Sequence, residues 1–156
     1  MIERRPATDG LKALIATLTG KPVGLGTLPV DPATGKPVPP PYTILDSLDR
    51  ADDDHTLADD GKAVVLTYQA TYVSGPDPQQ TDSRGRRAIP SVLRRRGWKV
   101  VERPADDATG YVHALNVGAG QTCWHREARE AGGTPDPNDG IITRVIRYKL
   151  YLEKTA

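Results

Sequence analysis

Apolar and polar residues alternate most regularly in residues 63–73, AVVLTYQATYV. One alternate set is apolar or aromatic, and its members are Val64, Leu66, Tyr68, Ala70 and Tyr72. Successive side chains of a strand point to opposite faces, and β-branched and aromatic residues fit a pleated surface. The segment therefore predicts a β-strand with one face in the core.

Weaker alternation of the same period predicts three more strands and one short strand. The three strands cover residues 42–48, 111–125 and 141–153, and the short strand covers residues 99–103. One face of the last strand carries Ile142, Ile146, Tyr148, Leu150 and Leu152, with Arg144 as an interruption. A polar loop over residues 127–140 separates the last two strands, which predicts a long β-hairpin.

Apolar residues three and four positions apart predict a helix over residues 9–19. They are Leu11, Leu14, Ile15 and Leu18, and this spacing places them on one helical face. Thr8 or Asp9 is expected to cap the start of the helix. Gly20 is expected to adopt the left-handed conformation after its last turn, and Pro22 prevents continuation.

A second helix is predicted over residues 78–96. Asp77, Pro78 and Gln80 form a capping-box pattern at its start. An apolar patch follows at helical spacing, made of Ala88, Ile89, Val92 and Leu93. Pro90 is expected to kink or split the helix, because it lacks the amide hydrogen that the ladder needs.

The segment between the first helix and the first strand is rich in proline. Residues 20–41 contain seven prolines, and the run Pro39, Pro40 and Pro41 favours an extended polyproline conformation. We expect this segment to be an extended arm that contacts either a neighbouring subunit or a connecting partner protein. The chain as a whole has the length of one ordinary domain. It predicts an α/β (α+β) fold, with a mixed or antiparallel four-stranded sheet and two main helices.

Charge and composition exclude several classes of protein. The chain has 21 basic and 20 acidic residues, a net charge of +1, which argues against a polybasic nucleic-acid binder. No stretch of about 18 apolar residues is present to span a membrane. A single cysteine excludes an internal disulfide framework. Only 37% of the residues are hydrophobic and none is Phe, which suits a subunit that completes its burial in an assembly.

Residues with catalytic chemistry form no convincing site. Cys123 and His125 would share a face of a regular strand, but a nucleophile also needs an orienting group and an oxyanion site. His55, His113 and His125 have no metal-ligand spacing. We therefore expect no enzymatic activity, no cofactor and no metal, and a small hydrolase that uses Cys123 is a minor alternative.

Two charged groups and the prolines are the candidate contact residues. The predicted second helix carries six arginines, of which Arg84, Arg87, Arg94 and Arg95 fall towards one broad side. Residues 52–60 contain five aspartates, which begin with Asp52, Asp53 and Asp54. Their spacing does not match a calcium loop. We expect some of the arginines to reach a neighbouring subunit or another partner, with the acidic loop as one candidate acceptor, and Pro39, Pro40 and Pro41 to join the interface.

The order of these segments resembles the tail terminator proteins of long-tailed (siphovirus) bacteriophages. The most specific pieces are the PPPYTIL segment, the strand LTYQATYVSG that continues into DPQQ, and the terminal IITRVIRYKLYL. The resemblance covers most of the chain. The chain departs from the family's compact examples in its arm over residues 20–41 and its loop over residues 127–140.

The resemblance implies a structural role. Tail terminators form a ring, usually a hexamer, on the last ring of the tail tube and stop its polymerisation. The implied partners are other copies of the chain, the tail tube protein and a head-completion or connector protein, while DNA passes through the lumen. The implied location is the tail-neck junction of the virion, after synthesis in the host cytoplasm. The alternatives are another neck or tail structural protein and a DNA-binding adaptor that uses the arginine helix.

Overall fold

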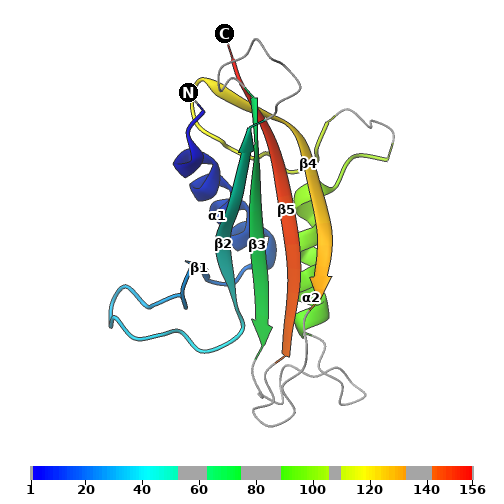
Figure 1. The fold of residues 1–156 in the computed structure, drawn as a ribbon. Coiled ribbons are helices and arrows are strands. Elements are labelled where there is room, and N and C mark those ends of the chain that lie inside the picture. The colour runs from blue at the N-terminus through cyan, green and yellow to red at the C-terminus, as the bar shows by residue number, and fades with distance from the viewer. Residues whose placement is uncertain (1, 53–62, 75–88, 106–109, 133–141, 156) are drawn as a thin grey trace.

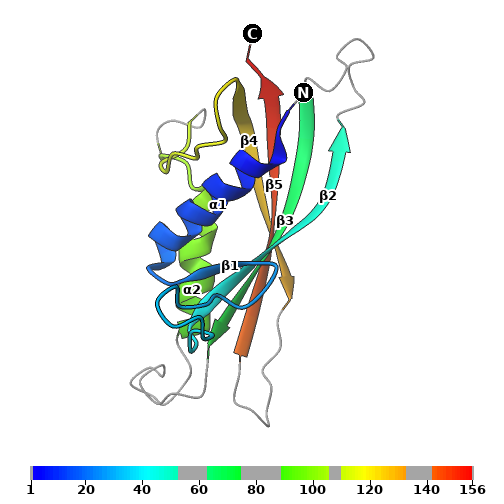
Figure 2. The same ribbon diagram turned by 90° about the vertical axis from the view of Figure 1, so that its left-hand side faces the viewer.

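A five-stranded sheet carries two helices on one of its faces (Figures 1 and 2). The structure, a computed structural model, describes residues 2–52, 63–74, 89–105, 110–132 and 142–155. In chain order its elements are α1 (Arg4–Thr19), β1 (Val23–Leu25), β2 (Tyr42–Asp52), β3 (Ala63–Ser74), α2 (Ile89–Trp98), the 3₁₀ helix η2 (Lys99–Val101), β4 (Gln121–Gly132) and β5 (Ile142–Lys154).

The strand order is β1-β2-β3-β5-β4. β1 runs parallel to β2, and all other neighbouring strands are antiparallel. The sheet is therefore mixed and the fold is α+β, as expected. The predicted hairpin of the last two strands is confirmed, because β4 pairs directly with β5.

The core lies between the two central strands and the helices. All five apolar positions predicted for one face of β3 are at most 1% exposed. On β5, Ile146, Tyr148, Leu150 and Leu152 are fully buried, opposite the buried positions of β3. The period of two in both segments therefore predicted the core face correctly.

The first helix is longer than predicted and has a different start. α1 begins at Arg4, and its N-cap residue Glu3 makes no side-chain capping bond. Thr8 is inside the helix, where its hydroxyl lies 2.8 Å from the hydroxyl of Tyr68 on the sheet. The capping prediction for Thr8 or Asp9 was therefore wrong. The predicted end is confirmed, since Gly20 has φ 67° and donates its N–H to the carbonyl of Ala16.

A glycine inside α1 allows close packing against a distant segment. A Cβ added at Gly10 would overlap the backbone carbonyl of Asn116. Glycine weakens a helix interior, so its place in α1 is explained by this approach of another backbone.

α2 is held to the sheet through a chain of two buried hydroxyl groups. The hydroxyl of Tyr148 donates to the carbonyl of Gly97 at 2.8 Å and lies 2.6 Å from the hydroxyl of Tyr72. Pro90 stands in the first turn of α2, a position that tolerates proline. The first part of the predicted helix, residues 78–88, lies outside the described residues. The predicted kink at Pro90 in a longer helix therefore stays a prediction.

Two strand predictions and the start of the predicted loop were wrong. Residues 99–101 form the 3₁₀ helix η2 instead of a strand, and the buried Val100 anchors it. The strand predicted over 111–125 begins only at Gln121, because Gly118 and Gly120 adopt positive φ angles of 95° and 76°. It then continues to Gly132, into the segment predicted as a loop.

The sheet also has a fifth strand, where four were predicted. β1 lies inside the proline-rich segment, in a stretch without proline that keeps its backbone donors. Thr43 on β2 also donates its N–H to the carbonyl of Pro22, just before β1. Being at the edge of the sheet, β1 tolerates the prolines that follow it.

Candidate interaction surface

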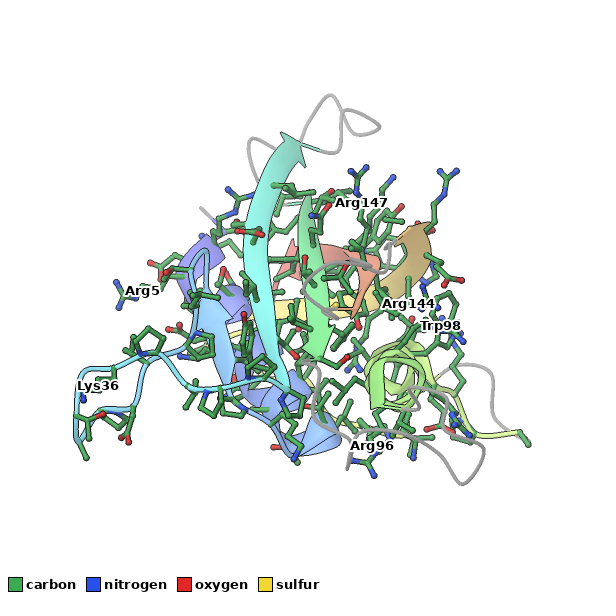
Figure 3. All side chains as sticks on the ribbon, turned by 90° about the horizontal axis from the view of Figure 1, so that it is seen from below. Arg5, Lys36, Arg96, Trp98, Arg144 and Arg147 are labelled. Atoms are coloured by element: carbon green, nitrogen blue, oxygen red, sulfur yellow. The ribbon has the colours of Figure 1, made fainter. Side chains whose placement is uncertain are left out.

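One face of the sheet is not covered by either helix. The outward positions of the three strands β3, β5 and β4 form this surface, which we call the open face. Two rows of paired residues cross it: Gln69, Arg147 and Arg129 in one row, and Thr67, Lys149 and Glu127 in the next. Figure 3 shows Arg147 on the side of the sheet opposite α2.

Three cations gather on the open face. Arg129 is directly opposite Arg147 in the β4–β5 register, and Lys149 is two residues further along β5. All three side chains are exposed. Arg147 Nε donates to Gln69 Oε1 at 3.2 Å, and no carboxylate among the described residues pairs with the three cations. Like charges directly opposite each other destabilise a strand pair, so this arrangement favours an external anionic group.

The cations surround a hollow of about 850 Å³. Its lining includes Thr67, Glu127, Arg129, Arg147 and Lys149. The side chain of Glu127 is engaged with its neighbours, because one oxygen lies 3.2 Å from His125 Nε2 and the other accepts the Tyr151 hydroxyl at 3.2 Å. Glu130 also lines the hollow and is paired with Arg94, so the hollow presents cationic groups beside two carboxylates that already have partners.

An aromatic cluster adjoins the hollow at the Gln121 end of β4. The register shifts between Cys123 and His125, which makes a β-bulge at Trp124. The Trp124 ring is 5.4 Å from the ring of Tyr151 and 5.7 Å from that of His125. Trp124 remains 50% exposed. Bulges commonly redirect a side chain, and this one leaves a large aromatic ring accessible beside the cations.

The bulge also corrects a prediction about Cys123 and His125. Cys123 pairs with Leu152 of the core face, whereas His125 pairs with Tyr151 of the open face, so the two side chains do not share a face. The Cys123 thiol donates to the backbone carbonyl of His125, at 3.4 Å. Burial raises the pKa of this thiol, although the nearby Arg126 opposes the shift.

A tyrosine outside the sheet holds the edge of β4. The hydroxyl of Tyr111 accepts the backbone N–H of Arg126 at 2.7 Å. The guanidinium of Arg126 lies 4.2 Å from the centre of the Tyr111 ring and donates to the carbonyls of Val100 and His113. Arg126 is 7% exposed, and burial lowers its pKa. The sequence pattern predicts a strand at Tyr111 and carries no signal of this contact with Arg126.

His125 connects the aromatic cluster to this edge. Its Nδ1 lies 3.2 Å from the guanidinium of Arg103, which also donates to the Tyr111 hydroxyl at 2.8 Å.

Among the described residues no group of three or more His, Cys, Asp or Glu side chains is placed to hold a metal ion.

The predicted arginine contacts are only partly within the described chain. Arg94 forms an ion pair with Glu130 of β4, at 3.5 Å. Arg95 is exposed. Arg96, the last of the six arginines, donates to the carbonyl of Thr19 and so joins α2 to α1. Arg84 and Arg87 lie outside the described residues.

The acidic loop over residues 52–60, the predicted acceptor of the arginines, lies outside the described residues except for Asp52. Asp52 is the last residue of β2 and pairs with Val64 of β3. Asp53 and Asp54 are outside the described residues, so the predicted pairing of the arginines with this loop stays a prediction.

The arm differs from the expected extended polyproline conformation. Its distal part folds back on itself, because Val38 donates its N–H to Pro29 and Asp31 donates its N–H to Lys36. Leu28 and Val30 are 41% and 56% exposed along it. Figure 1 shows this connection between β1 and β2 extending beyond the side of the sheet.

The three prolines before β2 lie at the end of the arm. Pro39 is exposed, whereas Pro40 and Pro41 are half-buried. The peptide bond between Pro40 and Pro41 is cis. Their predicted contact with another subunit stays a prediction.

No known protein-family model matches the chain, and no curated protein is significantly similar to it. In the part of the chain that the structure describes, every helix is too short or too polar to cross a bilayer.

Proposed function

We propose that the chain is a structural subunit of a phage tail, a tail terminator that forms a ring on the end of the tail tube. The observation that carries the proposal is the one-sided sheet with its projecting arm. The helices cover one face only (Figure 2), and Leu28 and Val30 are exposed on the arm. Exposed apolar side chains on a projecting segment are suited to burial against another subunit.

In the proposed ring, each copy places its arm on a neighbour, and the ring contacts the tail tube protein and a connector protein on its two sides. The chain then works at the tail-neck junction of the virion without an enzymatic step. Another neck or tail structural protein is the nearest alternative, since a tube subunit uses similar surfaces but stacks indefinitely.

A DNA-binding adaptor that uses the arginine helix is less well supported. Within the described residues Arg94 pairs with Glu130, and Arg96 binds the carbonyl of Thr19. These side chains make contacts within the chain, whereas a phosphate-binding helix needs its cations free for the ligand.

The first experiment measures assembly. Light scattering after gel filtration, with negative-stain imaging, is expected to show a closed ring of several 16.9 kDa subunits. Added to purified tube protein during polymerisation, the ring is expected to stop growth. A chain that remains monomeric at all concentrations and leaves tube length unchanged would refute the proposal, and indefinite stacking would favour a tube subunit.

A second experiment tests the arm. Deletion of residues 29–38 removes the folded-back part and leaves the sheet pairing of β1 intact, so we expect weaker assembly at nearly unchanged stability. Val30→Ser tests the same surface without a change in length, and Lys36→Ala is the matched control at the same end of the arm. Normal rings from both the deletion and Val30→Ser would show that the arm is only a surface loop.

A further inference from the structure

The open face combines cations and an accessible aromatic ring on one side of a sheet. Arg129, Arg147 and Lys149 have no carboxylate partner among the described residues, and they line one hollow. Trp124 lies at the adjoining end of β4, beside Tyr151 and half exposed. We propose that the open face binds single-stranded nucleic acid, with phosphates at the three cations and a base stacked on Trp124.

The cations fit phosphate groups in their arrangement. Arg147 and Lys149 are two residues apart on one strand, and Arg129 is directly across from Arg147 on the next. Side chains at these positions point to the same side of the sheet. The repulsion between the two opposed arginines is relieved when an anion binds between them, and a planar guanidinium recognises phosphate in a bidentate manner.

The aromatic cluster favours a single strand over other anions. The bulge leaves the Trp124 ring 50% exposed, and contacts with His125 and Tyr151 hold it in place. Unpaired bases stack on such rings regardless of sequence, whereas the bases of a duplex are already stacked on one another. An acidic protein segment would use the cations but gain little from Trp124.

Most polar neighbours on the same face are compatible with this ligand, and the acidic exception in these rows, Asp46 of β2, is separated from Arg147 by Gln69. Thr67 and Gln69 lie in the same rows as the cations, and their side chains can donate to phosphate oxygens. The one carboxylate that lines the hollow from this face, Glu127, is held by Tyr151 and His125. The proposal rests on these open-face residues alone, and it stands whether or not the chain forms a ring.

The test is binding of a labelled 20-nucleotide oligothymidine to the full chain, measured by fluorescence anisotropy at several salt concentrations. Three phosphate contacts predict a slope of log K against log salt of about −2, which is about a twentyfold loss of affinity between 50 and 200 mM salt. The double variant Arg129→Ala/Arg147→Ala is expected to reduce the slope to about −0.7. Arg5→Ala/Lys36→Ala is the matched control, because it removes two cations that lie away from the open face (Figure 3).

The aromatic contribution is tested separately. Trp124→Ala is expected to weaken binding between about fivefold and about 150-fold with an unchanged salt slope, since stacking contributes about 1–3 kcal/mol per base. Trp98→Ala is the control, because Trp98 is similarly exposed, at 41%, but lies on α2. In a Trp98→Phe background, the oligonucleotide is expected to quench the fluorescence of Trp124.

Three outcomes would overturn the proposal. The first is no binding at 50 mM salt by a chain with a normal circular dichroism spectrum. The second is equal loss of affinity in the open-face variants and in their controls. The third is a 20-residue oligoglutamate that displaces the oligothymidine as well as unlabelled oligothymidine does, together with an unchanged affinity in Trp124→Ala. This result would assign the face to an acidic protein partner. A duplex of the same length that binds at least tenfold more weakly than the single strand would support the proposal.

Discussion

Removal of the Tyr148 hydroxyl tests how α2 is held on the sheet. This hydroxyl has one hydrogen, which it donates to the carbonyl of Gly97. The hydrogen between the two tyrosines, whose oxygens are 2.6 Å apart, must therefore come from Tyr72. Tyr148→Phe thus breaks two hydrogen bonds: the buried Tyr72 hydroxyl loses its acceptor, and the Gly97 carbonyl loses its side-chain donor.

The magnitude follows from these two groups. A buried group that loses its partner costs about 1–3 kcal/mol, so we expect Tyr148→Phe to lower the free energy of unfolding by about 3 kcal/mol. Tyr72→Phe is expected to cost only about 1 kcal/mol, because the Tyr148 hydroxyl keeps its acceptor. The double variant is expected to cost less than the sum, since the Tyr72 donor is then absent.

Urea unfolding followed by circular dichroism measures these differences, at one protein concentration for all variants. Tyr151→Phe is the matched control, because its hydroxyl bonds an exposed carboxylate on the open face, and we expect it to cost less than about 1 kcal/mol. Equal costs for Tyr148→Phe and Tyr72→Phe would refute the assigned direction of the hydrogen bonds. Costs below about 0.5 kcal/mol for both would refute the view that the pair anchors α2.

Three other predictions concern stability and reactivity. Burial raises the pKa of Tyr68, Tyr72 and Tyr148 above the ordinary 10.0, so these groups keep their protons to higher pH in the folded chain than in the unfolded chain. The free energy of unfolding is therefore expected to fall as pH rises above about 10, by up to about 1.4 kcal/mol per pH unit for each tyrosine. Urea titrations at pH 8 and 10.5 measure this fall, and the free energy of unfolding of Tyr148→Phe should fall less between the two pH values than that of the unchanged chain. Gly10→Ala is expected to destabilise the chain by about 1–3 kcal/mol in the same assay, because the added Cβ would overlap the carbonyl of Asn116. The same change usually stabilises an exposed helix, so a stabilising effect would contradict the close packing at Gly10. Cys123 is expected to react slowly with a thiol reagent at pH 8, since burial raises its pKa, and to react at the rate of a free thiol in denaturing urea; fast reaction of the folded chain would show that the thiol is accessible.

Some parts of the fold were readable from local pattern. The alternation in residues 63–73 and 141–153 identified the buried face of both central strands, because burial on one side of a sheet imposes a period of two on the sequence. The end of α1 was equally local, since Gly20 can take the left-handed conformation that stops a helix. The candidate arginines were identified by residue type, but their partners were not. Arg94 meets Glu130, which is 36 residues away in the sequence and on a different element.

Tertiary contacts decided the rest. The residues before Gln121 resemble a strand in composition, but two glycines with positive φ and the Tyr111 hydroxyl at the edge of β4 place them outside the sheet. The sequence alone determined which side chains were apolar, polar or charged, and which strands had one buried face. Only the tertiary structure decided that Arg129 lies opposite Arg147, and that a bulge puts Cys123 and His125 on opposite faces. Strand register and bulges depend on pairing between segments distant in sequence, so no local pattern in either segment can specify them.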